Sequence, residues 1–133
     1  MSQENVEIVR KTIEARNRDL EEWLTFFDPE AETSDLLTAP VMTTEVLGLD
    51  ALRRDAEQWM EIFDDYEMEV VELLDLDELV LAELRFHGRG RVSGASVTAS
   101  QVDLYRVCDG LITELRAGYR SRDEALEAAG LQE

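Results

Sequence analysis

The last third of the chain limits the possible folds most, because strand-like runs there end in a tight turn and a short helix. From about residue 66 apolar and polar residues alternate, which predicts strands at 66–74, 79–89, 95–107 and 111–120. Asp109-Gly110 separates the last two strands and predicts a hairpin, since glycine accepts the positive φ of a tight turn. Ser121 and Glu124 predict the cap of a final helix, which Gly130 stops.

Three earlier segments carry apolar residues at helical spacing, with predicted N-caps at Ser2, Asp19 and Asp50. Glu22 completes a capping box in the second helix, which Asp28-Pro29 ends. The apolar stripes of the three helices are, in order, Val6, Val9 and Ile13, then Leu20, Trp23, Leu24 and Phe27, then Leu52, Ala56, Trp59, Met60 and Phe63.

Between the second and third helices we expect a short strand at 31–37 and a loop at 38–48. The resulting order is α-α-β-α-β-β-β-β-α over one domain, residues 1–133. Helices gathered early and strands gathered late indicate an α+β fold with a mostly antiparallel sheet. Such a sheet must curl around the helices to bury their stripes, which predicts a cone with an open mouth and a cavity.

Composition excludes several classes of partner. The formal charge of −18 repels phosphates and anionic lipids, so we expect no nucleic acid and no membrane partner. The chain has no run of 18 apolar residues, and its first residues lack the basic and apolar parts of a signal peptide. A single cysteine, Cys108, cannot form an internal disulfide, and we interpret it as incidental. These features favour the cytoplasm.

Asp103 is the residue that most needs an explanation. It is predicted to lie mid-strand, on one face with Val97, Ala99, Gln101 and Tyr105. A carboxylate there faces either water or a pocket that uses it.

The element order, with the phrases "SQENVEIVR", "DLEEWLTFFDPEAE" and "CDGLITELRAGYRSRDEALEAAGL", resembles the SnoaL-like branch of the nuclear transport factor 2-like superfamily. The resemblance covers nearly the whole chain. It implies a cystatin-like cone fold and a homodimer through the outer sheet face, with Val102, Leu104 and Ile112 as candidate contacts. The superfamily includes ketosteroid isomerase, limonene epoxide hydrolase, polyketide cyclases, scytalone dehydratase and non-catalytic binding modules, so function depends on the site.

The resemblance to ketosteroid isomerase implies two catalytic carboxylates. The phrase "AETSD" aligns Asp35 with the isomerase's general base, and "VDLYRVCDG" aligns Asp103 with its oxyanion-hole acid. Thr12 stands where the isomerase has its oxyanion-hole tyrosine, and Leu36 follows Asp35 where the motif has proline. Steroid isomerisation itself is therefore not expected.

Two carboxyl groups in one apolar cavity can divide acid–base work. Burial and proximity raise the pKa of one of them, which donates a hydrogen bond while the other acts as base. This suits proton abstraction next to a carbonyl, as in an isomerase or an aldol-type cyclase. The alternative is that Asp35 caps a loop and Asp103 faces solvent. No nucleotide-binding or nucleophilic motif is present, so we expect no cofactor.

A second cluster lies on strand 79–89, where Glu83, Arg85 and His87 alternate onto one face. An in-register neighbour would bring Arg85 near Gln101 and Glu83 near Asp103, a group that resembles the site of limonene epoxide hydrolase. The alternative is a cross-strand charge ladder outside the core. His87 is the only histidine, and no metal-ligand spacing is present, so we expect no metal site.

The remaining candidates are apolar or polar side chains expected to line the cavity and contact a substrate. For the apolar and aromatic ones the alternative is plain core packing, and for Arg85 and His87 it is the charge ladder outside the core. They are Trp23, Phe27, Trp59, Met60, Phe63, Arg85, His87, Gln101, Tyr105, Leu115, Ala117 and Tyr119.

Two functions therefore stay open beside the epoxide-hydrolase-like one. The first is a cofactor-free acid–base enzyme on a small hydrophobic carbonyl or polyketide-like compound. The second is a non-catalytic module that binds a small apolar molecule or supports a dimer. The second predicts an exposed Asp103 and a pocket that is dry, shallow or filled by Trp59 and Tyr119.

Overall fold

The computed structural model describes residues 2–35 and 45–130, with side chains over 3–34 and 48–130. None of its helices is long and apolar enough to cross a membrane, as far as these residues go. The elements follow one another in the order α1 (Ser2–Arg18), α2 (Leu20–Leu24), β1 (Phe27–Asp35), β2 (Glu45–Leu47), α3 (Leu49–Ile62), β3 (Phe63–Asp75), β4 (Leu79–Gly90), β5 (Ser96–Cys108), β6 (Leu111–Tyr119) and α4 (Arg122–Ala128).

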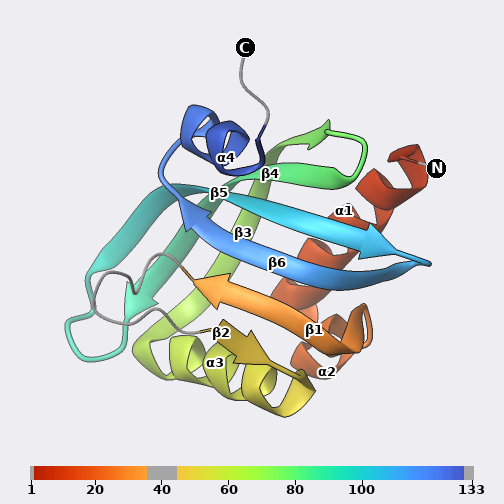
Figure 1. Ribbon diagram of the computed structural model, residues 1–133. Coiled ribbons are helices and arrows are strands. Elements are labelled where there is room, and N and C mark those ends of the chain that lie inside the picture. Colours follow the sequence, from red (N-terminus) through yellow and green to blue (C-terminus); the bar gives the residue numbers. More distant parts are fainter. Residues whose placement is uncertain (1, 36–44, 131–133) are drawn as a thin grey trace.

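The strands form one six-stranded sheet in the order β2-β1-β6-β5-β4-β3. Only β1 and β6 are parallel, and every other neighbouring pair is antiparallel. The two edge strands, β2 and β3, are joined by α3, which spans the open side of the curved sheet (Figure 1). The α+β fold predicted from the sequence is thereby confirmed, with the long strands β3 to β6 close to their expected bounds.

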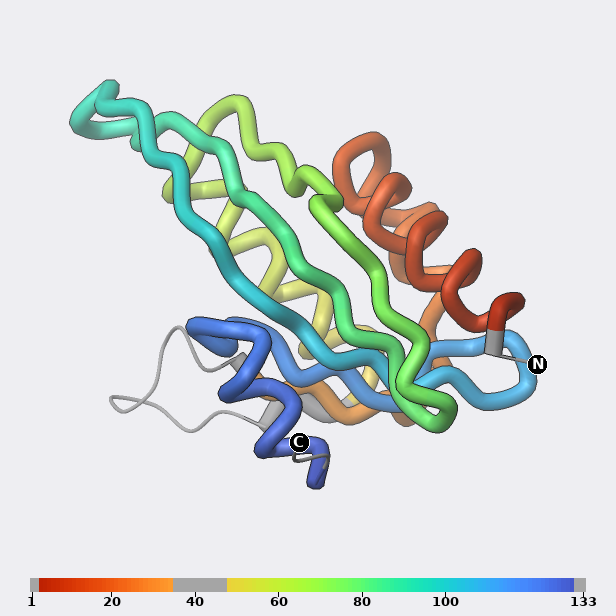
Figure 2. Tube along the Cα trace, turned by 90° about the horizontal axis from the view of Figure 1, so that it is seen from above, coloured from red at the N-terminus to blue at the C-terminus, as the bar shows by residue number. Residues whose placement is uncertain are grey.

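Two apolar clusters lie on opposite faces of the sheet. The larger joins α1, α2 and α3 to the inner face, and includes Val9, Trp23 and Leu84. The smaller lies under α4 on the outer face (Figure 2) and includes Val102 and Leu104, which are 4% and 1% exposed. Ile112 is 0% exposed and belongs to the inner cluster. The expectation that these last three residues form a dimer interface is therefore wrong, because the chain buries them itself.

The second helix and the strand after it differ from expectation. α2 ends at Leu24, and Phe27 is the first residue of β1 rather than the end of a helical stripe. Pro29 lies inside β1, where the pairing with β6 shifts between Phe27 and Glu32. Proline is tolerated there because an irregular stretch of strand does not need its missing N–H.

The segment before α3 also differs. The predicted loop 38–48 contains the short strand β2, which pairs with Glu32 to Ser34 of β1. Three residues are too few to show an alternating pattern. α3 takes Gly48 as its N-cap instead of Asp50, with no side-chain cap. Positions 36–37 of the predicted strand, with most of the predicted loop, fall outside the described residues.

Candidate functional site

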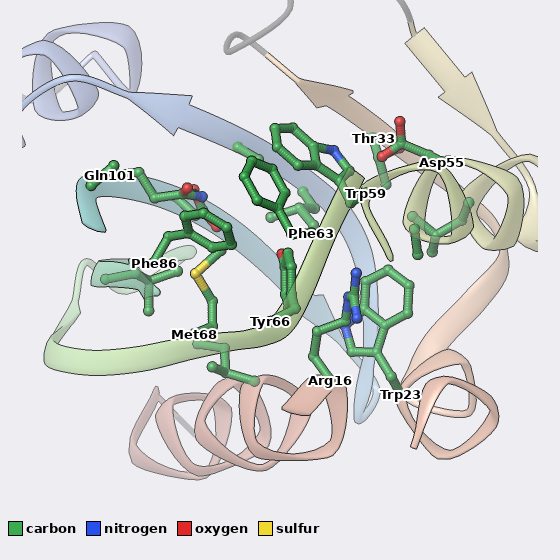
Figure 3. A pocket seen from close by; sticks show the side chains of 18 of the residues that line it. Arg16, Trp23, Thr33, Asp55, Trp59, Phe63, Tyr66, Met68, Phe86 and Gln101 are labelled. Atoms are coloured by element: carbon green, nitrogen blue, oxygen red, sulfur yellow. Dashed lines mark hydrogen bonds between the residues drawn. The ribbon is translucent and has the colours of Figure 1, made fainter. Parts of the chain in front are cut away.

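A cavity of about 270 Å³ lies between the inner face of the sheet and the three N-terminal helices (Figure 3). Its wall is mostly apolar and includes six aromatic side chains. At one end it reaches the exposed residues Val97, Ala99 and Ser100, where it opens to solvent. The aromatic lining residues are Trp23, Trp59, Phe63, Tyr66, Phe86 and Tyr105.

Asp103 is buried in the wall of this cavity, at 3% exposure. Its Oδ1 accepts a hydrogen bond from Gln101 Nε2 at 2.9 Å and another from the backbone N–H of Gly118 at 2.9 Å. Gln101 and Tyr105 lie on the same inward face of β5 and are also buried. Two fixed donors on one oxygen hold the carboxyl group in a single orientation toward the cavity.

The Gly118 donor comes from an irregularity in β6 that the sequence pattern did not indicate. Val102 pairs with Tyr119 while Leu104 pairs with Arg116, so β6 has one residue more than β5 at this point. Gly118 has φ +93°, a conformation that glycine adopts without strain. This bulge presents the Gly118 N–H to Asp103.

The same bulge explains why Tyr119 is not in the cavity. Strict alternation from Leu115 would place Tyr119 on the inner face, but one extra residue reverses the side on which it lies. Tyr119 instead packs with Leu79 and Leu81 on the outer face, under α4. The expectation that it lines the pocket is therefore wrong.

The second expected carboxylate, Asp35, ends β1 opposite Ala117 of β6. Its side chain lies outside the described residues, as does Leu36, so the pairing of Asp35 with Asp103 stays a prediction. Thr12, at the position of the isomerase tyrosine, is fully buried and its hydroxyl donates to the carbonyl of Ile8 at 2.6 Å. It does not line the cavity, so it offers no donor there.

The charged cluster of β4 faces away from the cavity. In the observed register Leu84, not Arg85, pairs with Gln101, and Ala82, not Glu83, pairs with Asp103. A difference of one residue exchanges the two faces of a strand. Leu84 therefore points inward, and the expected contacts of Arg85 and Glu83 with the Asp103 face are wrong.

Glu83, Arg85 and His87 instead form a cross-strand charge ladder on the outer face, as the alternative interpretation of the sequence expected. His87 Nε2 lies 2.9 Å from Glu69 Oε1, and Arg85 lies 3.9 Å from the same oxygen. Glu83 accepts from Arg122 of α4 at 2.6 Å. The joint contact of Glu83 and Arg85 with Asp103 that an epoxide-hydrolase-like site requires is absent from the described side chains.

The other residues expected in the cavity divide into two groups. Trp23, Trp59, Phe63, Gln101, Tyr105, Leu115 and Ala117 line it. Phe27 does not, because it packs edge-on against Trp23 with ring centroids 4.9 Å apart. Met60 is 39% exposed and does not line the cavity, although it lies one helical turn after the inward Ala56 on the last turn of α3.

Several lining residues were not singled out from the sequence. Tyr66 and Met68 follow Phe63 on the inward face of β3, and Asp55 lies beside Thr33 on the α3 side (Figure 3). Arg16 is three residues beyond Ile13 of the first helical stripe, the one signal that places it on the inner side of α1. A charged residue that follows an apolar stripe is usually interpreted as solvent-exposed, so the sequence alone did not indicate that Arg16 lines the cavity.

The electrostatics of the cavity are clearest at Tyr105. Burial raises the pKa of its phenol well above the ordinary value of 10.0, and the negative charge of Asp103 raises it further. Tyr66 adds to this increase, while the positive charge of Arg16 opposes it. Tyr105 therefore stays protonated and cannot act as a base near neutral pH.

We expect one of the three tyrosines to resist ionisation in the folded protein. Because the folded-state pKa of Tyr105 lies above its unfolded value, its contribution to stability is complete below pH of about 10 and is lost as pH rises through the folded-state pKa. Ultraviolet titration of tyrosinate should show a late step that Tyr105→Phe removes. A late step of unchanged size in that variant would contradict the assignment.

Comparison with known proteins places the chain in a family. The model of the SnoaL-like domain matches residues 9–115. The chain belongs to the SnoaL-like domain family. No curated protein sequence matches it.

Solved structures agree on the fold. A Jannaschia sp. CCS1 protein, named among the SnoaL-like polyketide cyclases, superposes with a TM-score of 0.77 at 20% identity, over 88% of this chain and 85% of that one. A Catenulispora acidiphila protein with a ketosteroid isomerase-like fold, in complex with trimethylamine, gives 0.76 at 16% identity over 95% and 94%. A nuclear transport factor 2-like protein of Burkholderia thailandensis gives 0.74 at 22% identity over 96% and 97%. These likenesses show the shared SnoaL-like, ketosteroid isomerase-like fold.

Proposed function

We propose that this SnoaL-like protein is a cofactor-free acid–base enzyme that acts on a small, largely apolar carbonyl compound, with Asp103 as its base. The observation that carries the proposal is the buried Asp103 carboxyl group, held by two N–H donors in the wall of an apolar cavity. A module that only binds an apolar molecule gives no reason for a buried carboxylate in such a wall. The names of the polyketide cyclase and the isomerase-like neighbour support the same class of chemistry.

Two of the partners of Asp103 favour a basic role. The Gln101 amide nitrogen and the Gly118 backbone nitrogen can only donate, and donors favour an oxygen that carries negative charge. These two contacts therefore favour a carboxylate that accepts a proton, in contrast to the acid role that the resemblance implied for Asp103. The role of Asp35 as a second carboxylate remains a prediction.

The reaction begins with proton transfer. The Asp103 carboxylate takes a proton from the carbon next to the substrate carbonyl, the C–H electron pair forms a C=C bond, and the carbonyl π pair moves onto oxygen. The Asp103 carboxyl group then returns a proton, to the same carbon or to a conjugated one. In a cyclase the enolate carbon would instead attack a second carbonyl of the same molecule, and the proton would go to the new alkoxide.

Exchange of hydrogen for deuterium tests this step without knowledge of the natural substrate. The purified protein is incubated with cyclohexenone, α-tetralone and β-tetralone in heavy water, and loss of the proton signal next to the carbonyl is followed by nuclear magnetic resonance. Because the cavity opens to solvent beside Val97, the abstracted proton can exchange before it returns. We expect faster exchange than in buffer for at least one ketone. Exchange at the buffer rate for all three, at saturating ketone, would contradict the enzyme proposal.

A further inference from the structure

Arg16 is the one cationic side chain among the described residues that line the cavity, and aromatic side chains surround it. Its guanidinium carbon lies 4.5 Å from the ring centroid of Tyr66 and 5.2 Å from that of Trp23. These rings come from β3 and α2, so three elements meet at the guanidinium (Figure 3). Cation–π contacts of this kind hold a guanidinium in place.

The Arg16 guanidinium keeps N–H groups for a ligand. Its carbon lies over both rings, and the group carries five N–H donors in its own plane. Over the described part of the chain, no ion pair or hydrogen bond joins the Arg16 guanidinium to another side chain. Arg18, two residues further on, instead holds Glu22 in a pair of hydrogen bonds at 2.7 and 3.0 Å. A half-buried guanidinium in the cavity wall that has no side-chain partner of this kind can donate to an oxygen of a ligand.

Arg16 and Asp103 both line the cavity, as does Tyr105. Both charges act on the Tyr105 hydroxyl, since Asp103 raises its pKa and Arg16 lowers it. A ligand that fills the cavity can therefore contact a carboxylate and a guanidinium. A carbonyl compound bound there can present its α-carbon to the carboxylate and its oxygen to the guanidinium.

The chemistry of the proposed reaction needs a donor at that oxygen. Proton abstraction places negative charge on the carbonyl oxygen, and a pre-positioned donor in a water-poor site lowers the barrier. Thr12 cannot supply it, because its hydroxyl already donates to the Ile8 carbonyl. Arg16 lies one helical turn after Thr12 on the same side of α1.

We propose that Arg16 donates to the carbonyl oxygen of the ligand and stabilises the enolate that forms there, an inference that rests on the proposed function. The charges of the wall also define the substrate class. Over the described residues, the cavity is lined by one guanidinium and by two carboxylates, Asp55 and Asp103. This balance disfavours a permanently anionic ligand and suits a neutral ketone or polyketide-like compound that becomes anionic only during reaction.

The test uses umbelliferone, a small bicyclic phenol whose neutral and anionic forms differ in absorbance and fluorescence. Its bound phenolate imitates an enolate oxygen. We expect Arg16→Gln to raise the pKa of the bound phenol by about one unit or more relative to the unchanged protein, the size of effect that a neighbouring guanidinium has. Arg10→Gln is the matched control, because Arg10 lies on the same helix, pairs with Glu7 and is absent from the cavity wall. It should leave the pKa of the bound phenol unchanged.

The Arg16 variants should also differ in turnover. With the exchange assay, Arg16→Gln should slow ketone exchange by about a hundredfold to a thousandfold, as loss of one oxyanion donor does elsewhere. Arg16→Lys keeps the charge but loses the planar arrangement of donors. Its bound-phenol pKa and its exchange rate should therefore lie between those of Arg16→Gln and those of the unchanged protein. It also carries the test if Arg16→Gln does not fold.

The two proposals fail separately. An unchanged phenol pKa in folded Arg16 variants, or no binding of the phenolate by the unchanged protein, would overturn the role of Arg16. If Asp103→Asn slows exchange while the Arg16 variants leave the bound phenol unaffected, only the Arg16 inference fails. If the phenol pKa responds to Arg16 but exchange does not respond to Asp103, the acid–base proposal fails and an oxyanion-binding site remains.

Discussion

Replacement of Asp103 by asparagine should slow ketone α-proton exchange by about a hundredfold to ten-thousandfold, the contribution that a positioned base makes. Asparagine has almost the same shape but cannot accept the proton. Its Oδ1 can still accept from Gln101 and Gly118, because both donors meet at the Asp103 Oδ1. The fold should therefore survive, and the loss should appear in the rate rather than in stability.

The matched control is Asp109→Asn. It makes the same chemical change at an exposed residue of the β5–β6 turn, far from the cavity wall. Asparagine also suits the positive φ of 52° at that position. Both variants should unfold at the urea concentration of the unchanged protein to within a small difference. Equal exchange rates in Asp103→Asn and Asp109→Asn would remove Asp103 from the mechanism.

The sequence predicted the sheet well because most of its strands are long and one-sided. β4 alternates between the inward Leu84 and Phe86 and the outward Arg85 and His87, and its position was predicted within a residue. Prediction failed where a strand was too short, as in β2, or where alternation was interrupted. The bulge at Gly118 has no signal beyond one glycine, yet it reverses the side of Tyr119.

The candidate site was predicted in part for the same reason. Asp103, Gln101 and Tyr105 lie on one uninterrupted face of β5, so their common direction followed from period two alone. The registers between strands did not follow, because turn geometry sets them and a shift of one residue exchanges faces. That is why Glu83 and Arg85 were expected near Asp103 but lie on the outer face.

Arg16 illustrates a different limit. Its approach to the cavity depends on where Trp23 and Tyr66 lie, two residues that are distant in sequence and belong to different elements. No local sequence pattern predicts that Arg16 contacts both of these rings. The residues that bear on chemistry here are thus partly local, as along β5, and partly the product of how α1, α2 and β3 pack together.

Leu104→Ala should lower the free energy of unfolding by about 2–5 kcal/mol, a large part of the stability of a small domain. Leu104 is 1% exposed and packs with Leu79, Leu81 and Ala125 beneath α4, so truncation leaves a cavity. The matched control is Ile62→Ala, which removes a side chain of equal size that is 56% exposed. It should change the free energy by less than about 0.5 kcal/mol. Urea denaturation measures both.

Protein concentration distinguishes this burial from a dimer contact. A residue that stabilises the chain by internal packing lowers stability by the same amount at every concentration, whereas an interface residue acts through association and its effect changes with concentration. We expect the Leu104→Ala deficit to be equal at low and at tenfold higher protein concentration. A loss in the free energy of unfolding below about 1 kcal/mol, or one that varies with concentration, would mean that Leu104 belongs to a surface that another copy of the chain covers. The fold predicts an equal loss at both concentrations, because α4 of the same chain already covers that face.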